Sequence, residues 1–334
     1  MRTSTGAVRI DVLLGPREDR SLAYDVLDGL TRPFKEIPPK HLYDTEGSRL
    51  FDAICSLPEY YQTRTERAIL EGAARALVRA TGAAELVELG SGVPTKTRVL
   101  LDAMQEAGTL ALYVPVDVSE AVLRASAEQL VEAYPGLRVH GVLGDFERHL
   151  GALPAPDGPR LTAFLGGTIG NFLPGSRRRF LRAIARTLRP QDRLVLGVDL
   201  VKDPAVLEAA YNDAGGITAA FSRNVLAVIN RELRGDFDLR AFEHVAFYDR
   251  YHEWIEMRLR TLAPQVVHIE RLGLTVHFAH REELRTEVSA KFTPARLDAD
   301  LAAAGLQPTA LLTDPRRLFA VSISRPGAPC RAGA

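Results

Sequence analysis

Apolar and polar positions follow a strand–helix rhythm between about residues 62 and 199. Apolar residues spaced three and four apart over Ile69–Leu77 predict a long helix, for which Thr65 is a suitable cap. Short apolar runs then recur between amphipathic stretches: ELVEL, ALYVPV, LRVHGVL, LTAFLG and RLVLGVDL. Strands that alternate with helices are typical of a parallel sheet covered by helices on both faces. The pattern therefore predicts an α/β core.

The rhythm changes on both sides of this core. Residues 21–61 predict short helices broken by Pro and Gly, and Asp203–Glu232 predicts further helices. Phe247–Leu262 and Val266–Phe278 alternate as antiparallel strands do. A helix after Thr293 and the strands PTALLT and LFAVSIS return to the end of the core sheet, and the final strand is a candidate antiparallel one.

These elements predict a discontinuous organisation. The core would consist of residues 62–199 plus 290–325. A second domain of α+β type would consist of residues 18–61 plus 200–289. Residues 1–17 and 326–334 are expected to be loose termini.

Composition excludes several classes of function. Lys plus Arg and Asp plus Glu number 42 each, so the net charge is zero and we expect no nucleic-acid partner. Cys55 and Cys330 do not make a disulfide framework, and no apolar run reaches membrane-spanning length, so we expect a cytoplasmic protein without a membrane partner. His277 and His280 lack the spacing of a zinc motif, so we expect no metal.

The loop Gly90–Gly92 lies directly between a buried strand and a helix, as cofactor-binding loops do. Asp117 ends the second strand, where an acidic side chain accepts ribose hydroxyls. Asp145 ends the third strand and could accept from an adenine amine, while the ring of Phe146 could cover the base. Glu88 could shape the pocket from below. Each carboxylate alone could instead cap a helix, but together they favour an adenosine site.

A dinucleotide site is the alternative for this loop. Its third glycine position is occupied by Thr95, so a pyrophosphate would lose its usual close packing. This favours S-adenosylmethionine, which has no phosphates, over NAD. Lys96 could bind the carboxylate of this methyl donor or lie on the helix surface.

Six ordered motifs together resemble the histidine-specific methyltransferase family of ergothioneine biosynthesis. They are PPKHLYDTEGSRLF, LPEYYQTRTE, LGSGVPTKTR, FLGGTIGNF, GVDLVKDPAVLEAAYNDAGGITAAF and TEVSAKF. The resemblance runs from about Leu22 to about Ser324. It implies a class I (Rossmann-like) methyltransferase core and a discontinuous second domain that binds L-histidine. The implied product is the Nα-trimethylated betaine, hercynine, formed in three transfers without a metal.

The resemblance also assigns the residues of the site. Around the methyl acceptor, it implies that Tyr60 and Asn171 hold the α-carboxylate and amine, Tyr211 holds the carboxylate, Tyr43 lies near the amine, Met257 lines the imidazole pocket, and Glu287 and Ser289 hold the imidazole. Around the methyl donor, it implies binding by Gly90, Lys96, Asp117 and Asp145, with Phe146 beside the adenine. We assign Tyr43 and Asn171 to catalysis.

Spacing gives an independent reason for the ring contacts. Glu287 and Ser289 are two residues apart, so in a strand their side chains point to one face. A carboxylate beside a hydroxyl can bind both imidazole nitrogens, although a solvated sheet face would show the same pattern. Asn171 follows the fourth strand, at the sheet edge where ligands bind, or it is a loop residue that satisfies its own turn. Tyr60 could equally be a core aromatic.

The chain departs from the family pattern at five positions: Gly167, Trp254, His280, Arg281 and Leu312. Arg281 stands where the family often has Gly, and Trp254 where it often has Arg. These departures put the fine shape of the pocket in doubt and leave the expected ring contacts in place.

Three other functions remain open. The chain could methylate another aromatic amino acid, such as a tryptophan derivative, although such a ring would not need Glu287. It could be an NAD-dependent oxidoreductase, or a protein that binds without turnover. No strong general base is present in the motifs, so the substrate amine would lose its proton to water or with help from Tyr43. We expect a monomer.

Overall fold

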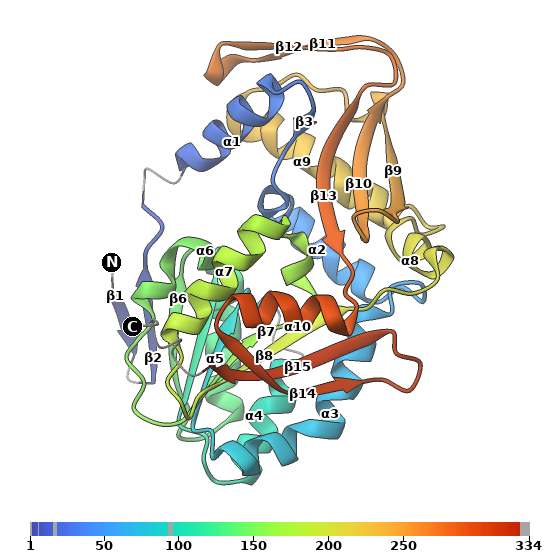
Figure 1. The fold of residues 1–334 in the computed structure, drawn as a ribbon. Coiled ribbons are helices and arrows are strands. Elements are labelled where there is room, and N and C mark those ends of the chain that lie inside the picture. The colour runs from blue at the N-terminus through green and yellow to red at the C-terminus, as the bar shows by residue number, and fades with distance from the viewer. Residues whose placement is uncertain (1, 6, 16–18, 93–95, 328–334) are drawn as a thin grey trace, which may run out of the picture. The chain divides into compact units, whose positions relative to one another are not determined.

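The structure is a computed structural model that describes residues 2–5, 7–15, 19–92 and 96–327. It divides into two compact units, and the chain passes between them more than once (Figure 1). Unit 1 contains Met1–Leu14, Gln62–Leu200 and Phe292–Ala334. Unit 2 contains Gly15–Tyr61 and Val201–Lys291.

Unit 1 is built on a sheet with the strand order β1-β2-β6-β5-β4-β7-β8-β15-β14. The central strands are β4 (Glu85–Leu89), β5 (Leu112–Asp117), β6 (Arg138–Leu143), β7 (Arg160–Phe164) and β8 (Arg193–Asp199). These five run parallel to one another, and β15 (Phe319–Pro326) pairs antiparallel with β8 and with β14 (Leu306–Thr313). The predicted α/β core is therefore confirmed, as is the antiparallel final strand.

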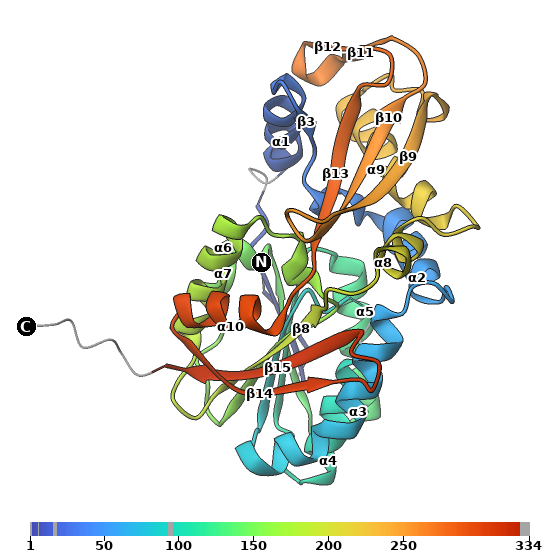
Figure 2. The same cartoon turned by 45° about the vertical axis from the view of Figure 1, so that its right-hand side comes forward.

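Helices cover both faces of this sheet, which is why its central strands are continuous apolar runs. On one face, α3 (Gln62–Thr81), α4 (Thr97–Glu106) and α5 (Glu120–Ala133) bury a shared cluster that includes Leu70, Leu101 and Leu130. On the other face lie α6 (Phe146–His149), α7 (Pro174–Thr187) and α10 (Pro294–Ala303) (Figures 1 and 2).

The first residues of the chain extend the sheet. The expectation of a loose arm over residues 1–17 is wrong here, because β1 (Arg2–Thr5) and β2 (Val8–Val12) form an antiparallel pair. Strand β2 also runs parallel to β6. Ile10 is buried against Leu123 and Leu143, and this apolar contact fixes the strand to the sheet. Of the expected C-terminal tail, residues 328–334 lie outside the described part.

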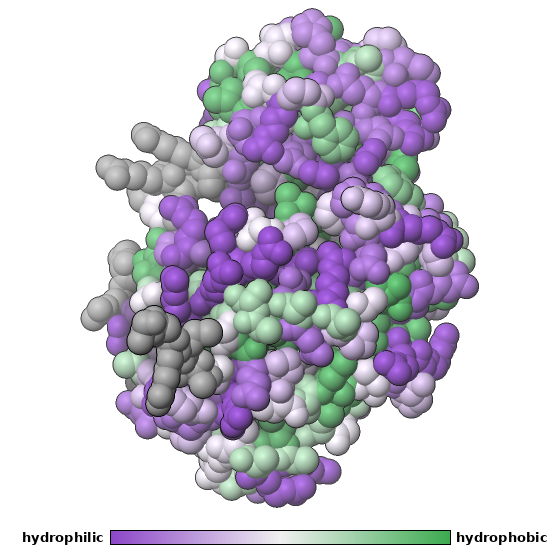
Figure 3. Space-filling model, in the orientation of Figure 1, coloured by the Kyte–Doolittle hydropathy of each residue, from purple (hydrophilic) through white to green (hydrophobic). Residues whose placement is uncertain are grey.

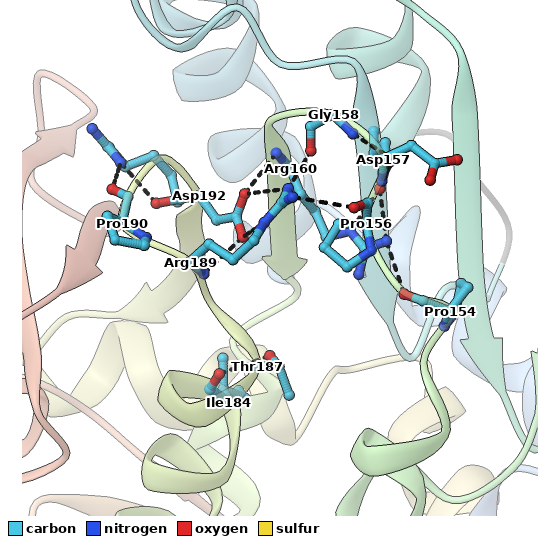
Figure 4. A network of polar contacts seen from close by, with 12 residues as sticks. Pro154, Pro156, Asp157, Gly158, Arg160, Ile184, Thr187, Arg189, Pro190 and Asp192 are labelled. Carbon is cyan, nitrogen blue, oxygen red and sulfur yellow. Dashed lines mark hydrogen bonds and ion pairs between the residues drawn. The ribbon is translucent and has the colours of Figure 1, made fainter.

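A network of charged side chains closes the edge of the sheet where β4 and β7 begin (Figure 4). The guanidinium of Arg160 donates to the carboxylate of Glu85 at 2.6 and 2.9 Å, and both residues are buried. Glu85 also accepts from the backbone N–H of Asp157 and Gly158. Asp192 accepts from the backbone of Arg160 at 3.0 Å. This edge lies at the strands' amino ends, whereas Asp117 ends β5 at the carboxyl edge.

Unit 2 combines a four-stranded sheet with helices. The sheet order is β3-β13-β10-β9, and a separate two-stranded sheet pairs β11 with β12. The strands are β3 (Lys35–Glu36), β9 (Phe242–Asp249), β10 (Trp254–Thr261), β11 (Gln265–Ile269), β12 (Leu274–Phe278) and β13 (Glu283–Ala290). The helices are α1 (Asp19–Thr31), α2 (Thr45–Cys55), α8 (Pro204–Tyr211) and α9 (Ile217–Leu233). The predicted antiparallel strands are confirmed by the pairs β9–β10 and β11–β12.

The exposed surface is mixed in character. On the face shown in Figure 3, hydrophobic residues lie in separate groups among hydrophilic ones. The exposed large hydrophobic side chains come from distant parts of the sequence, such as Tyr24, Val118 and Leu311. Within the described residues, no helix is both long enough and apolar enough to cross a membrane.

Candidate functional site

The glycine loop after β4 is shaped around the carboxylate of Asp117. Gly90 and Gly92 adopt φ of +69° and +47°, a conformation that favours glycine. The backbone N–H of Gly92 donates to Oδ2 of Asp117 at 2.9 Å, and the N–H of Ser119 donates to Oδ1 at 2.9 Å. The hydroxyl of Ser91 is buried and has no hydrogen-bond partner within the described protein. A buried, unsatisfied hydroxyl in such a loop fits a site for a polar ligand.

The ring of Phe146 lies against this loop. A Cβ at Gly90 would stand 3.4 Å from Cε1 of Phe146, so the ring lies within van der Waals reach of the loop. Asp145 precedes Phe146 and caps α6, because its Oδ1 accepts from the N–H of Glu147 at 2.8 Å. The helix-cap role considered for Asp145 is thus present. The cap bond engages Oδ1 of Asp145.

Lys96 makes an ion pair with Glu66, a residue that the sequence analysis missed. Its Nζ lies 2.5 Å from Oε2 of Glu66, whose side chain is fully buried on α3. Both carboxylate oxygens of Glu66 also accept from the N–H of Gly166 at 2.8–2.9 Å. The Glu66 side chain reaches Lys96 and Gly166 by passing over β8 at Gly197. A Cβ at Gly197 would stand 1.8 Å from Oε1 of Glu66, so a side chain there would block this path. The Glu66 carboxylate therefore connects the start of α4 with the loop that follows β7.

Glu88 lies beneath the glycine loop as a buried carboxyl. It accepts from the hydroxyls of Thr97 at 2.5 Å and Tyr113 at 2.6 Å. Burial raises the pKa of Glu88 to about 7, although both hydrogen bonds and the charge of Lys96 favour its ionised form. Glu88 thus links the end of β4 to the first residue of α4 and to β5; that it shapes a ligand pocket stays a prediction.

Asn171 ends a single 3-10 turn, η3 (Thr168–Asn171), which directly follows β7. Gly166 and Gly167 lead into this turn with φ of +79° and +70°. At Gly167 the family often has Ser, and the left-handed backbone explains why glycine is well suited there. The side chain of Asn171 is partly exposed at the carboxyl edge of the sheet, the edge where ligands bind in open α/β sheets.

In unit 2, the predicted imidazole contacts share one face of the sheet. In the antiparallel pair of β10 with β13, Met257 lies opposite Glu287 and Ile255 lies opposite Ser289. Directly opposite residues place their side chains on the same face, close enough to touch. Glu287 and Ser289 are 8% and 5% exposed, so they do not belong to a solvated sheet face.

Aromatic side chains of unit 2 stand beside one another in a connected group. The ring centroids of Tyr43 and Phe51 are 5.4 Å apart, those of Phe51 and Tyr60 6.2 Å, and those of Tyr60 and Tyr211 6.3 Å. Phe221 of α9 packs on Tyr43 at 5.3 Å. This aromatic group brings together the three tyrosines that the sequence assigned to the methyl acceptor.

A local helix cap lies directly beside Tyr43. Tyr43 precedes Asp44, which caps α2 by accepting from the N–H of Gly47 and also accepts from the Asn224 amide on α9 at 2.7 Å. Desolvation and then the nearby charge of Glu287 hold the pKa of Tyr43 well above 10. The Tyr43 hydroxyl therefore stays a neutral phenol at physiological pH, which can donate or accept a hydrogen bond but is not a phenolate base.

Lys291 is a second residue that the sequence analysis missed. Its Nζ donates to the hydroxyls of Tyr211 at 2.8 Å and Ser289 at 2.9 Å, and these two oxygens are 2.8 Å apart. Lys291 is fully buried, and its charge counteracts the burial that raises the pKa of Glu287 to about 7. Its spacing of two from Ser289 could have indicated a shared strand face.

The remaining departures from the family pattern are compatible with the fold. Trp254, where the family often has Arg, keeps a donor because its indole N–H reaches Oε2 of Glu256 at 3.2 Å. His280 and Arg281 lie in an exposed turn before β13. Leu312 on β14 packs its apolar side chain against the core of unit 1.

The predicted site residues are thus divided between the two units. Unit 1 brings Gly90, Asp117 and Phe146 together and contains Lys96, Asp145 and Asn171. Unit 2 brings together Tyr43, Tyr60, Tyr211, Met257, Glu287 and Ser289. Among the described residues, no group of three or more His, Cys, Asp or Glu could hold a metal ion.

Comparison with known proteins places these features in a known context. The sequence model of a family described as "Histidine-specific methyltransferase, SAM-dependent" matches residues 22–326. The chain is 52% identical to a histidine N-alpha-methyltransferase of Mycolicibacterium smegmatis and 51% identical to one of Mycobacterium tuberculosis, each over 91% of this chain and 94% of the relative. It is 33% identical to ergothioneine biosynthesis protein 1 of Schizosaccharomyces pombe, over 64% of this chain and 29% of that protein.

Proposed function

Because the chain belongs to the family of histidine-specific, S-adenosylmethionine-dependent methyltransferases, we propose that it methylates the α-amino nitrogen of L-histidine. Three successive transfers would give hercynine, the first step of ergothioneine biosynthesis. The α/β sheet of unit 1 is the predicted class I methyltransferase core. The observation that carries the choice of substrate is the buried pair Glu287 and Ser289 on one strand face, with Met257 opposite Glu287.

We assign the methyl donor to unit 1. Bound S-adenosylmethionine supplies an electrophilic methyl group on a sulfonium, so the protein has mainly to position and align it. The loop at Gly90 allows close approach, Asp117 accepts the ribose hydroxyls, and Phe146 covers the adenine. Asp145 accepts from the adenine amine, and Lys96 donates to the carboxylate of the donor. The buried Ser91 hydroxyl, which has no partner within the described protein, supports a polar ligand at this loop.

We assign the ring of the methyl acceptor to unit 2. Glu287 accepts from the imidazole N–H and Ser289 binds the other ring nitrogen, while Met257 packs on the ring. Tyr60, Tyr211 and Asn171 hold the α-carboxylate and amine. Glu287 could accept from the N–H of an imidazole or of an indole. Only the imidazole has a second ring nitrogen for Ser289, so the pair of residues favours histidine over tryptophan.

The amine must be deprotonated before its lone pair can attack. Tyr43 is a neutral phenol, so we assign it the role of hydrogen-bonding the amine or a water beside it, and the proton leaves to water. Tyr43→Phe should lower kcat and alter its pH profile. An unchanged rate and profile would remove Tyr43 from the mechanism.

The decisive experiment is mass spectrometry of amino acids after incubation with the protein and S-adenosylmethionine. Histidine should gain three methyl groups, and tryptophan should gain none. Methylation of tryptophan but not histidine would contradict the proposal, and donor binding without any transfer would favour a binding protein.

A matched pair of variants tests the ring contact. Glu287→Gln should lower kcat/KM for histidine by roughly 10- to 100-fold, since a charged hydrogen bond of about 1.5–3 kcal/mol is lost. The control is Glu283→Gln, which changes a glutamate of the same strand whose carboxylate instead pairs with Arg258 and Arg260. Equal losses in both variants would mean that the effect is structural.

We also infer a monomer that works in the cytoplasm. The two widely spaced cysteines, which make no disulfide framework, support a reducing compartment. Light scattering at micromolar concentration should give the mass of one chain, and a mass of two chains would contradict it.

A further inference from the structure

Gln62 is a buried glutamine whose side-chain amide has no partner within the described protein. It is the first residue of α3 and is 2% exposed. Neither its Nε2 nor its Oε1 makes a hydrogen bond there. A buried amide with both polar atoms unpaired destabilises the folded chain, so a ligand or an ordered water is needed to satisfy it. The amide is therefore a candidate ligand contact, and the proposed mechanism gives it no role.

Helix α3 begins at the edge of the large sheet where the proposed donor site lies. Glu66, one turn after Gln62, accepts from the N–H of Gly166, just beyond the carboxyl end of β7. The other end of α3 lies shortly before β4 begins, so the helix runs from the carboxyl edge to the amino edge. Residues four apart share a helix face, and helical side chains tilt toward the helix N-terminus. Gln62 therefore lies on the face of Glu66, nearer to the ligand edge.

The strand order indicates which part of the methyl donor this face would meet. Asp145 follows β6 and Asp117 ends β5, and we assign both to the adenosine part. Strand β7 lies on the far side of β4 from these two, three strand spacings of about 4.8 Å from β6. The ammonium of Lys96 lies beside the loop after β7, since a Cβ at Gly166 would stand 3.3 Å from Nζ. With the adenosine over β5 and β6, the amino-acid end of the donor extends toward Lys96 and the start of α3.

The chemistry of the amide matches that end of the donor. A side-chain amide has two N–H donors and a carbonyl acceptor, and both of its polar atoms are unpaired here. An α-amino acid group offers the complement, a carboxylate that accepts and an ammonium that donates. This group is a zwitterion without net charge. The neighbouring ion pair of Lys96 and Glu66 is also neutral overall, and a neutral amide adds hydrogen bonds without adding charge.

We propose that Gln62 binds the amino-acid end of the methyl donor, with its N–H group donating to the α-carboxylate and its carbonyl accepting from the α-ammonium. This inference rests on the proposed function, because it takes S-adenosylmethionine as the donor. It adds a contact from α3 to those assigned to the glycine loop and to Lys96. The amide is then unsatisfied in the free protein, and binding of the donor satisfies it.

Calorimetry with two nucleosides isolates this contact from the rest of the donor site. S-adenosylhomocysteine keeps the amino-acid end, whereas 5′-methylthioadenosine keeps the adenine, ribose and thioether and lacks that end. Gln62→Met replaces the amide by an apolar chain of similar length. The variant should raise the Kd for S-adenosylhomocysteine roughly 10- to 100-fold, because hydrogen bonds to charged groups are lost. The Kd for 5′-methylthioadenosine should be unchanged.

Thermal unfolding without ligand gives a second readout. Because the amide of Gln62 is unpaired in the free protein, Gln62→Met should have a Tm equal to or above that of wild type. S-adenosylhomocysteine at one fixed concentration should then raise the Tm of the variant less than that of wild type. The matched control is Gln265→Met, because Nε2 of Gln265 already donates to the carbonyl of Ala241 at 3.2 Å. This control should not gain stability and should keep both Kd values.

Three results for Gln62→Met would overturn the inference. An unchanged Kd for S-adenosylhomocysteine would mean that only an ordered water satisfies the amide. An equal rise of both Kd values would assign the loss to a displaced α3, and a lower Tm of the free variant would reveal a structural partner for the amide. If Gln62→Met does not fold, Gln62→Glu, which keeps an acceptor and loses both N–H donors, should show the same selective loss of S-adenosylhomocysteine binding, and unchanged affinity would again contradict the role.

Failure of the proposed function would be seen in the wild type. Wild-type protein that binds neither nucleoside would disprove the proposed donor site itself. Selective loss of S-adenosylhomocysteine binding in Gln62→Met, together with no methylation of histidine by the wild type, would support the role of Gln62 and disprove the proposed substrate.

Discussion

The buried carboxylate of Glu287 lowers the stability of the substrate-free protein when it is ionised. Burial raises its pKa from 4.5 to about 7, so the folded state binds this proton more tightly than the unfolded state. Stability contributed by the protonated form is therefore lost as pH rises from about 4.5 to about 7. Glu287→Gln should be more stable than wild type at pH 8, by up to about 3 kcal/mol, and the gain should shrink at pH 5. Urea unfolding at the two pH values measures this, and a gain independent of pH would contradict the cause.

Arg281 is in a left-handed conformation, with φ of +61°, at a position where the family often has Gly. That conformation destabilises a residue with a side chain by roughly 1–2 kcal/mol. Glycine avoids this strain, but it loses more backbone entropy on folding, which offsets part of the gain. Arg281→Gly should therefore stabilise the protein by about 1 kcal/mol or less, seen as a higher Tm. Arg281→Ala keeps the strain and is the control, so an equal gain in both variants would assign the effect to the lost arginine side chain.

Individual contacts were predictable only where the chain itself brings the residues together. The spacing of Glu287 and Ser289 gives their common strand face directly, and the structure buries both. Lys291 follows the same rule but lies just beyond the strand. Glu66 could not be inferred from local pattern, because its partners Lys96 and Gly166 come from elements far along the chain.

At the scale of elements, strands and helices with strong apolar periodicity were the predictable ones. The runs that became β4–β8 are buried on both faces, and this is why they are continuously apolar. Strand β2 was missed because VRIDV is short and half polar, and its structure depends on pairing with β6, which follows it by more than a hundred residues. Pairing of that kind leaves little trace in local sequence.

The crossing of α3 over β8 depends on the absence of a side chain at Gly197. A Cβ there would stand 1.8 Å from Oε1 of Glu66, so Gly197→Ala should displace the carboxylate from Gly166 and Lys96. We expect the Kd for S-adenosylmethionine to rise roughly tenfold, measured by calorimetry. Gly141→Ala on β6 is the control, since its Cβ meets the flexible end of Leu123 at 3.1 Å. Unchanged affinity in Gly197→Ala would show that Glu66 does not organise the donor site.

At the scale of the whole molecule, a buried ion pair and the proposed donor site lie at opposite edges of the large sheet. Arg160 and Glu85 form a buried ion pair at the strands' amino ends. Arg160→Met should cost about 3–5 kcal/mol, because the carboxylate of Glu85 stays buried without its counter-charge. The free energy of urea unfolding measures this loss. The affinity of the folded Arg160→Met variant for S-adenosylmethionine should be unchanged, and weaker binding would contradict the separation of the two sheet edges. Adding Glu85→Gln to Arg160→Met should recover part of the lost stability.

The first fourteen residues also determine how the large sheet ends. Strand β2 occupies the hydrogen-bonding groups along one side of β6, and β1 in turn covers β2. A protein shortened to begin at Gly15 would present β6 as a bare template to other chains. Such a protein should associate and precipitate at concentrations where the full chain remains dispersed, even though every residue assigned to either ligand is still present.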